Sequence, residues 1–552
     1  MGAKYPGGLW MVPVLALASL GASPPEVPLI EAVKKADTTA VRAQLQRRAD
    51  VNAAEPDGST ALHWAARLND LETATLLIRS GANVKAANRF GVTPLALAST
   101  TGTAAMIELL LKAGADPNST SAEGEPALMT AALTGRVDVL QTFLAHGAKV
   151  DAKESWKGQT ALMWAAVRGH TAAIQFLIKA GADINARANG QFTPLLFAVR
   201  EGHIDAVRAL LEAGATPNDR ILKPLMSRRG PSGNEQVVTS ALALAMLNGH
   251  YELAALLLEK GADPNVADAR GSVLHVLAWM RRPGLPAGRD RSAPPPTGTL
   301  DSLDLAKLLL AKGAKPNTRI AWKEIRFDRD DQEALDPPDI AVGRNYLSYV
   351  GATPFYLAAR NGDVALMRLL VANGADPLLG TVQNVTPLMA ASGLGWWEGE
   401  TPGPLTGTTE SERLEAVKLT IELGGDVNAV TDFGDTPIVG VGVDLLRQYP
   451  DNLDQFPETA LGDMRWGGST ALHGAIMASG QHSIIQFLVE KGAKIDARNK
   501  LGWTPLMIAE GILLTNERRY PETAELLRRL MRERNLDPEL YSQRAAQRST
   551  SR

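Results

Sequence analysis

The eight histidines of this 552-residue chain are the side chains best suited to acid–base chemistry or metal binding near neutral pH. Three of them each follow a leucine in a recurring phrase: His63, His275 and His473. Three more each follow a glycine: His170, His203 and His250. Only His146 and His482 lie outside these two settings, and neither has a partner at metal-ligand spacing. The histidines therefore predict no metal site.

Other catalytic signatures are absent from the sequence as well. The chain has no cysteine, which excludes disulfides, thiol catalysis and cysteine-based metal sites together. It contains no G-x-S-x-G, no H-E-x-x-H and no phosphate-binding loop of the Walker type. We therefore expect no catalytic residues, no cofactor and no metal, and we expect that the protein is not an enzyme.

The elements around the first group of histidines repeat along the chain. The phrase Thr60-Ala61-Leu62 returns as Thr93-Pro94-Leu95, Thr160-Ala161-Leu162 and Thr193-Pro194-Leu195. A second phrase, Gly-Ala followed by a polar residue, begins at Gly81, Gly114, Gly147, Gly181 and Gly214. These glycines are 33 or 34 residues apart. A period of this length predicts a solenoid of stacked units.

One unit, residues 88–116, predicts the local structure of the others. Gly91 is suited to a tight turn, Thr93 to capping the first helix and Pro94 to the first helical position. Apolar residues at helical spacing form a second helix, which ends at Gly114. One unit cannot bury its own apolar face, so stability must come from stacking.

The period near 33 and the T-P-L-H-x-A-A core resemble the ankyrin-repeat family, in its bacterial-type, exported form with long insertions. The resemblance implies an all-α solenoid of about twelve helix-turn-helix repeats with finger loops and capping units at both ends. It also implies that His63 and its equivalents form a hydrogen bond within the turn. The core positions expected of the repeats are Leu62, Leu95, Leu128, Leu162, Leu195, Leu242, Leu274, Phe355, Leu388, Ile438, Leu472 and Leu506. The unit at Ile438 shows no convincing second helix, and residues 28–52 resemble an N-terminal cap.

The regular period breaks after Gly214. Insertions at residues 219–237 and 318–350 enlarge the fingers between repeats, and those at 281–299 and 394–411 enlarge the turn between two helices, as does a smaller one near 511–521. We divide the chain as follows: a leader, 1–25; a regular array with its N-terminal cap, 26–218; an array with long insertions, 219–467; the final repeats and a C-terminal cap helix, 468–537; and a disordered tail, 538–552.

The two ends carry different signals. Lys4, an apolar run from Leu9 to Ala18 and small residues up to Ser23 are typical of a secretory signal peptide, so we expect export to the periplasm or beyond, with a disordered leader of a cytoplasmic protein as the alternative. The run is too short for stable membrane insertion. Arginines 528, 529, 532 and 534 are better explained as the polar outer face of a cap than as a nucleic-acid or membrane site. The net charge of −3 also argues against nucleic acid.

These features favour a non-catalytic scaffold that binds another protein, of unknown identity, through its concave face, its finger tips and its aromatic insertions. Trp64, Trp164 and Phe197 occupy the variable position after the core phrase and are either a contact stripe or plain packing between repeats. Trp322 and Tyr346 lie in one insertion, and Trp396 and Trp397 in another; exposed tryptophans are common interface anchors. The alternative is an enzyme or small-ligand-binding module built from the insertions on an ankyrin frame.

Overall fold

The computed structural model describes residues 27–121, 124–227, 230–268, 271–281, 296–320, 351–381, 383–394, 409–432, 467–477, 481–500, 502–511 and 520–542. The chain divides into an N-terminal unit that ends at Ile221 and a C-terminal unit that begins at Leu222. Each unit is described by itself below.

The local structure of a repeat follows from its turn chemistry as the sequence predicts. Thr93 Oγ1 accepts a hydrogen bond from the backbone N–H of Ala96 at 3.2 Å, and Pro94 is the first helical residue. Gly114 follows the second helix with φ of 97°, a left-handed conformation that glycine adopts without a steric penalty. Threonine caps with the same geometry begin the first helices at Thr160, Thr193, Thr353 and Thr504.

The N-terminal unit is built of paired helices joined by short turns. Its helices are α1 (Pro28–Lys34), α2 (Thr38–Gln46), α3 (Ala61–Arg67), α4 (Leu71–Arg79), α5 (Pro94–Thr101), α6 (Ala104–Lys112), α7 (Ala127–Thr134), α8 (Val137–Ala145), α9 (Ala161–Val167), α10 (Thr171–Lys179), α11 (Pro194–Glu201) and α12 (Ile204–Glu212). The first helix of each pair packs on the first helices of its neighbours, and the second helices stack likewise.

The C-terminal unit continues the same pairing. Its helices are α13 (Ala241–Leu247), α14 (Tyr251–Glu259), α15 (Val273–Arg281), α16 (Ser302–Ala311), α17 (Pro354–Arg360), α18 (Val364–Ala372), α19 (Pro387–Ala391), α20 (Glu410–Glu422), α22 (Ala471–Met477), α23 (His482–Glu490), α24 (Pro505–Ala509) and α25 (Pro521–Arg532), followed by the 3-10 helix η4 (Pro538–Tyr541). The described ranges hold twelve helix pairs: the predicted N-terminal cap, formed by α1 and α2, and eleven of the twelve predicted repeats; the remaining one, at Ile438, lies outside the described residues.

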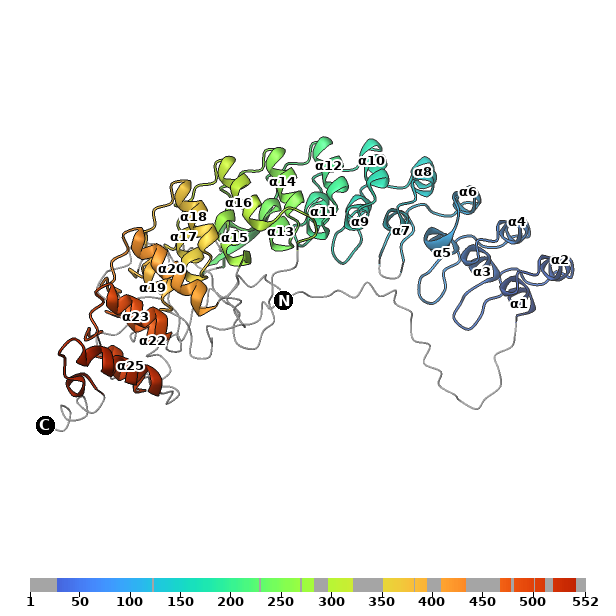
Figure 1. Cartoon of the computed structure of the whole chain (residues 1–552). Helices are drawn as coiled ribbons and strands as arrows, with labels where there is room; N and C mark the ends of the chain where they lie inside the picture. Colours follow the sequence, from blue (N-terminus) through green and yellow to red (C-terminus); the bar gives the residue numbers. More distant parts are fainter. Residues whose placement is uncertain are drawn as a thin grey trace, which may run out of the picture. The chain divides into compact units, whose positions relative to one another are not determined.

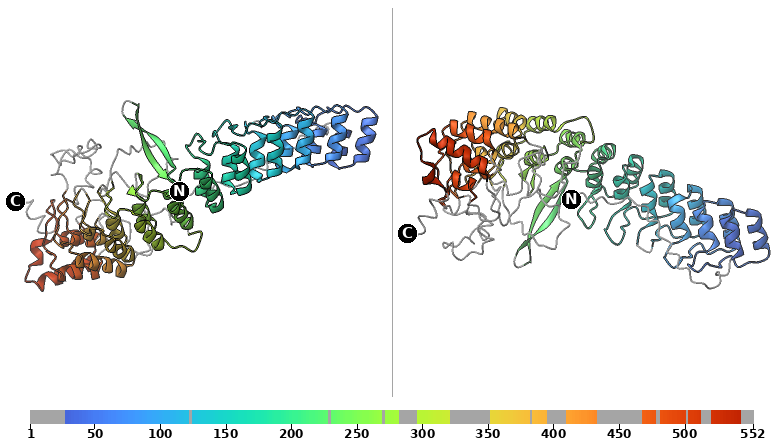
Figure 2. Two further views of the ribbon diagram at one scale, coloured as in Figure 1. Left: turned by 90° about the horizontal axis from the view of Figure 1, so that it is seen from above. Right: turned by 60° about the horizontal axis from the view of Figure 1, so that its bottom comes forward.

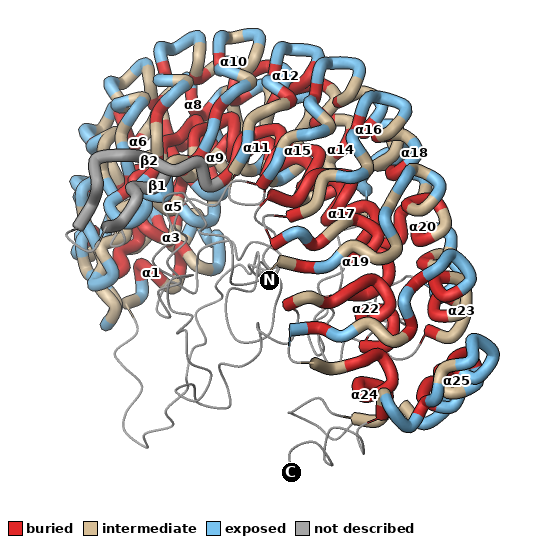
Figure 3. The backbone as a smooth tube through the Cα atoms, turned by 90° about the vertical axis from the view of Figure 1, so that its left-hand side faces the viewer, coloured by how far each residue is buried: buried red, intermediate tan, exposed pale blue. Residues whose placement is uncertain are grey.

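In each unit the first helices and the finger loops, which join one repeat to the next, lie along one side, and the second helices lie along the other (Figure 1). We call these the first-helix side and the second-helix side. The core lies between them, and the first helices are almost wholly buried (Figure 3). Every predicted core position that the structure describes is at most 2 % exposed; Ile438 lies outside the described residues.

Two short sheets interrupt the helical array. Strands β1 (Arg220–Ser227) and β2 (Gly230–Ser240) pair as a long hairpin in the place of the first finger insertion (Figure 2). Strands β3 (Ala267–Asp268) and β4 (Gly271–Ser272) form a much shorter antiparallel pair. The sequence predicts the insertion but not its strands.

A side-chain amide joins successive repeats across the finger loops. Asn52 Nδ2 donates to the carbonyl of Gly81 at 3.2 Å, and Asn52 Oδ1 accepts from the backbone N–H of Asn83 at 2.7 Å. We call this pair of bonds the asparagine clamp. The same two bonds are formed by Asn118, Asn265, Asn317 and Asn428. The clamps of Asn265 and Asn317 span insertions, so the repeats on either side of these insertions keep the same relation as uninterrupted ones. The clamp of Asn428 joins the repeat of α19 and α20 to that of α22 and α23 across residues 433–466, which lie outside the described residues and include the predicted repeat at Ile438.

The insertions occupy the places that the sequence predicts. Residues 282–295, 395–408 and 512–519 fall between the two helices of a pair, whereas residues 321–350 fall between α16 and α17, at a finger. The finger is closed at its base, because the backbone N–H of Ile320 donates to the carbonyl of Ala352 at 2.9 Å.

The C-terminal end differs from the sequence-based expectation. We predict a disordered tail from residue 538, but η4 packs against α24 and α25. Thr504 Oγ1 donates to the carbonyl of Tyr541 at 2.6 Å, and Pro538 is buried. The last repeat therefore uses η4 to cover its outer end, and the described structure extends to residue 542.

Candidate functional site

The three histidines of the recurring phrase form hydrogen bonds between repeats. The backbone N–H of Thr60 donates to His63 Nδ1 at 3.1 Å, so Nδ1 is unprotonated and Nε2–H donates to the carbonyl of Val92 at 3.0 Å. His275 and His473 repeat this arrangement, with Nε2 reaching the carbonyls of Ala352 and Trp503. The predicted hydrogen bond in the turn is confirmed, and each ring also ties its repeat to the next one.

Burial determines the protonation of these rings. It lowers the pKa of His275 and of His473 to about 4, and it lowers the pKa of His63 as well. All three are therefore neutral near pH 7, and both nitrogens of each ring are occupied. A ring in this state has no free lone pair with which to take a proton from a substrate.

Two of the histidines that follow a glycine also form hydrogen bonds to a neighbouring repeat. His170 Nε2 lies 3.0 Å from the carbonyl oxygen of Leu133, and His203 Nε2 lies 3.0 Å from that of Val167. Within the described ranges, no three His, Asp or Glu side chains are grouped so that they could hold a metal ion.

Trp64 lies on the first-helix side of the N-terminal unit, on α3. Its indole Nε1 donates to Glu55 Oε2 at 2.7 Å. Lys34 Nζ and the Arg67 guanidinium lie 4.7 Å and 5.2 Å from the ring centroid, and Lys34 also pairs with Glu55. The ring is half-buried between these cations, so it is fixed in orientation but still reaches solvent.

The other two predicted positions on first helices differ in burial. Trp164 on α9 is half-buried, and its Nε1 is buried with no hydrogen-bond partner among the described residues. Phe197 on α11 is 5 % exposed, and its ring centroid lies 5.1 Å from that of Phe192. Phe197 thus packs against the finger that precedes its own helix.

The most exposed aromatic side chain in the described structure is one that the sequence reasoning missed. Trp156 lies at the tip of the finger between α8 and α9 and is 78 % exposed. The Glu154 carboxylate accepts hydrogen bonds from the backbone N–H groups of Trp156 at 2.6 Å, of Lys157 at 2.7 Å and of Gln159 at 3.0 Å. Glu154 itself is 6 % exposed. The finger is thus held by a buried carboxylate while its tryptophan points into solvent.

The electrostatics of Glu154 agree with this geometry. Burial alone would raise the pKa of its carboxyl, but the three backbone N–H donors outweigh that effect and lower the pKa below its ordinary value. The next finger adds support, because Asn189 donates to the carbonyls of Trp156 and Lys157 at 2.9 Å and 2.8 Å. The sequence signal was available: a tryptophan stands in the turn of a finger where the neighbouring repeats have Phe90, Glu123 or Gly190.

The remaining predicted site residues cannot be placed. Trp322, Tyr346, Trp396 and Trp397 all lie outside the described residues. The three predicted positions that the structure describes, Trp64, Trp164 and Phe197, lie on three different repeats.

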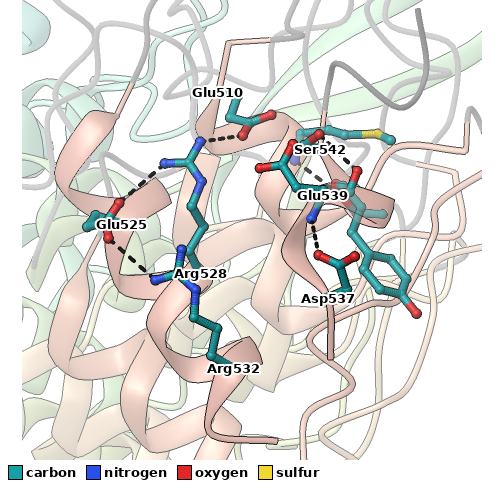
Figure 4. Close-up of polar contacts among 10 residues, drawn as sticks. Glu510, Glu525, Arg528, Arg532, Asp537, Glu539 and Ser542 are labelled. Carbon is teal, nitrogen blue, oxygen red and sulfur yellow. Dashed lines mark hydrogen bonds and ion pairs between the residues drawn. The ribbon is translucent and has the colours of Figure 1, made fainter. Parts of the chain in front are cut away.

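The arginine-rich helix α25 has most of its charge paired. Arg528 forms ion pairs with Glu510 at 2.6 Å and Glu525 at 3.4 Å, and Arg532 pairs with Glu525 at 3.9 Å (Figure 4). Arg534 donates to the carbonyls of Leu530 and Val489. This arrangement fits the polar outer face of a cap, as we expect from the sequence.

An open groove of about 550 Å³ lies between α23 and α25. It is lined by His482, Gln486, Glu522, Glu525, Leu526, Arg529 and Arg532. His482 Nε2 is 3.1 Å from Thr523 Oγ1, so the histidine is held against α25. Both signs of charge line the groove, so it favours neither anions nor cations.

No helix among the described residues has the length and apolar character needed to cross a membrane.

Comparison with known proteins identifies the repeat. A model of ankyrin repeats in three copies matches residues 29–121, 102–188, 128–221 and 191–268; a model of many copies matches 470–509, and a model of the single ankyrin repeat matches 350–381. Together these matches take in more than half of the chain. Among solved structures, the crystal structure of the human ASB11 ankyrin repeat domain is 24 % identical over 47 % of this chain and 100 % of that one, with a TM-score of 0.36. No curated protein matches the sequence.

Proposed function

Because this chain belongs to the ankyrin-repeat family, whose repeats generally mediate protein–protein interaction, we propose that it is a non-catalytic scaffold that binds another protein. It binds through the first-helix side, the finger tips and the aromatic insertions. The observation that carries this proposal is the exposure of Trp156. Its side chain is 78 % exposed at the tip of a finger whose backbone is held by hydrogen bonds. A ring on a fixed loop contributes contact area with little loss of conformational entropy on binding.

The state of the histidines supports the non-catalytic part of the proposal. Both ring nitrogens of His63, His275 and His473 are hydrogen-bonded: Nδ1 within the turn and Nε2 to the next repeat. An enzyme assembled from the insertions would need its acid, base or nucleophile from elsewhere in the chain.

Trp156 lies in the first half of the chain, but we place the contacts that select the partner in the second half, with Trp396, Trp397 and residues 320–350 as anchors. The support is that the aromatic residues outside the repeat pattern gather in these insertions. Large exposed apolar segments are uncommon on proteins whose only task is spacing.

The experiment begins with the partner, captured from the native source by the mature chain and identified by mass spectrometry. Its affinity is then measured for Trp396→Ala/Trp397→Ala and for Trp64→Ala/Trp164→Ala, with circular dichroism as the control for folding. Loss of a true anchor weakens binding about thirtyfold. Normal binding by the first pair, together with loss in the second, would move the interface to the regular first-helix side.

We also propose that the chain is exported and that its leader is removed near Ser23. The support is the apolar run followed by small residues described above. Cell fractionation with an antibody against the folded array measures the compartment. Recovery of the protein in the cytoplasm with its leader intact contradicts this proposal and leaves the scaffold proposal standing.

A further inference from the structure

Four asparagines of the chain are followed directly by a glycine: Asn189, Asn248, Asn361 and Asn373. In such a pair the backbone nitrogen of the glycine can attack the side-chain carbonyl carbon of the asparagine, because the glycine has no Cβ to hinder the approach. The attack closes a succinimide ring and releases ammonia. In a folded chain it requires that the N–H of the glycine is free of other partners.

Three of the four pairs are engaged at the end of a helix. Asn248, Asn361 and Asn373 are the C-cap residues of α13, α17 and α18. The backbone N–H of the glycine that follows each of them donates to a carbonyl of the same helix, at 2.9, 3.1 and 3.0 Å. These nitrogens cannot leave their acceptors unless the last turn of the helix opens.

The fourth pair lies in a different setting, because Asn189 is part of the finger between α10 and α11. Both Asn189 and Gly190 are exposed. Among the described residues, the backbone N–H of Gly190 donates to no acceptor. The φ of Gly190 also lies outside the left-handed region, whereas Gly249, Gly362 and Gly374 have φ of 74°, 69° and 87°. The attacking nitrogen is therefore free in this pair.

Asn189 also holds the neighbouring finger, which carries Trp156. Its Nδ2 donates to the carbonyl of Trp156 at 2.9 Å, and its backbone N–H donates to the carbonyl of Lys157 at 2.8 Å. The two fingers are in close contact, since a Cβ added at Gly158 would lie 2.6 Å from Asn189 Oδ1. A chemical change of the Asn189 side chain therefore acts directly on the Trp156 finger.

We propose that Asn189 and Gly190 form a self-modification site, at which the chain converts its own asparagine to aspartate and isoaspartate and thereby loosens the Trp156 finger. The nitrogen of Gly190 loses its proton and bonds to Cγ of Asn189. The bond from Cγ to Nδ2 breaks, and Nδ2 leaves as ammonia with that proton. Water then opens the ring. Its hydroxyl adds to Cγ to give aspartate or to the backbone carbonyl carbon to give isoaspartate, and its proton goes to the ring nitrogen.

Both products lose the contact that holds the Trp156 finger. An ionised aspartate has only acceptor oxygens, so it cannot donate to the carbonyl of Trp156, and the two oxygens repel each other. Isoaspartate adds a methylene group to the main chain, which displaces the turn at Gly190. Glu154 still binds the backbone of the Trp156 finger, so the finger is loosened rather than unfolded. An effect on partner binding rests on the function proposed above, whereas the modification itself does not.

The test incubates the full purified chain at neutral and mildly alkaline pH and follows the four pairs by peptide mass spectrometry, with chromatography to separate the two products. Conversion at Asn189 should be about tenfold faster than at Asn373, which is also exposed but whose glycine must first break a backbone hydrogen bond. The rate at Asn189 should rise with pH, because the attacking nitrogen must lose its proton.

Two variants separate the chemistry from its consequence. Gly190→Ala places a Cβ where no atom lies within 4 Å and at a φ that suits an L residue, so the fold should be unchanged while the attack is hindered and conversion falls several-fold. Asn189→Asp reproduces one product and should speed amide hydrogen exchange of residues 155–158 several-fold. Asn373→Asp, the matched control in the C-terminal unit, should leave that exchange unchanged.

Three outcomes overturn the inference. Equal conversion at Asn189 and Asn373, or conversion at Asn189 that Gly190→Ala does not slow, would show that this pair is not a succinimide site. Unchanged exchange of residues 155–158 in Asn189→Asp would show that the modification does not loosen the finger. None of these results touches the scaffold proposal, since no partner takes part in the measurements.

Discussion

The two fully buried histidines of the C-terminal unit predict that its stability falls as the pH falls from 7 to 5. The pKa of His275 and of His473 is about 4 in the folded chain, because burial disfavours the charged ring, against about 6.5 when unfolded. The unfolded chain therefore binds more protons in this window. Stability is fully present above pH 6.5 and is lost as the pH falls toward 4.

The magnitude follows from the two pKa values. Between pH 7 and pH 5 each histidine should remove about 2 kcal/mol from the free energy of unfolding, and the limit below pH 4 is about 3 kcal/mol for each. Both rings lie in one unit, so we expect a combined loss of about 4 kcal/mol at pH 5. This is a large part of the stability of an ordinary domain.

The assay is urea denaturation of the full chain at pH 7, 6 and 5, followed by far-UV circular dichroism. The comparison is with His275→Gln/His473→Gln, whose side chains do not titrate in this range. The variant should be less stable at pH 7, but its free energy of unfolding should change less with pH. The difference between the two pH dependences gives the contribution of the histidines, because the carboxylates are the same in both proteins. His473→Gln alone should remove about half of the difference. Parallel pH profiles for the wild type and the double variant would refute the reasoning.

Further predictions test the core, the finger, the clamp and the leader. Leu162→Ala and Leu195→Ala should each lower the free energy of unfolding by about 2–5 kcal/mol, because both side chains are at most 1 % exposed; losses below about half a kcal/mol at both sites in chemical denaturation would mean that the register of the core is wrong. Glu154→Ala should speed amide hydrogen exchange at Trp156 and Lys157, since their N–H groups lose the carboxylate, and unchanged exchange would show that the tip is held by other contacts. Asn317→Ala should lower the free energy of unfolding by about 1–3 kcal/mol, with Asn373→Ala, whose amide bonds only within its own helix, as the control. N-terminal sequencing of the natively expressed protein should begin near Ser23, whereas an intact Met1 or Gly2 would contradict export.

The repeat pattern was sufficient to predict the helical framework. Thr93 caps the first helix of its repeat, and Leu95, two residues later, is buried in the core. Because every stacked repeat buries the leucine at this position, the short phrase predicts both where the helix begins and which face is buried. The hydrogen bond of His63 within its turn was expected from the family resemblance, and in the structure its donor is the backbone N–H of Thr60.

Other features depend on contacts that no short phrase specifies. The hairpin of β1 and β2 replaces an expected loop, because strand pairing depends on two segments that meet only in the folded chain. The position of η4 depends on contacts with the last repeat, such as the hydrogen bond from Thr504 Oγ1 to the carbonyl of Tyr541, and the tail sequence alone does not specify them. Trp156 was missed because its exposure results from the buried Glu154, and burial of a carboxylate is contrary to what composition predicts.

The asparagine clamps hold neighbouring repeats together even where a long insertion separates them in the chain, so an intact peptide through the insertion is not needed for their contact. Asn317 bonds to Gly374 and Asp376, Ile320 pairs with Ala352, and His275 reaches the same Ala352, so both sides of residues 321–350 are held without the intervening peptide. A chain cleaved once within those residues should therefore remain one particle under native conditions. If the chain is expressed as two polypeptides divided at this point, the two parts should associate through the α15–α17 and α16–α18 contacts.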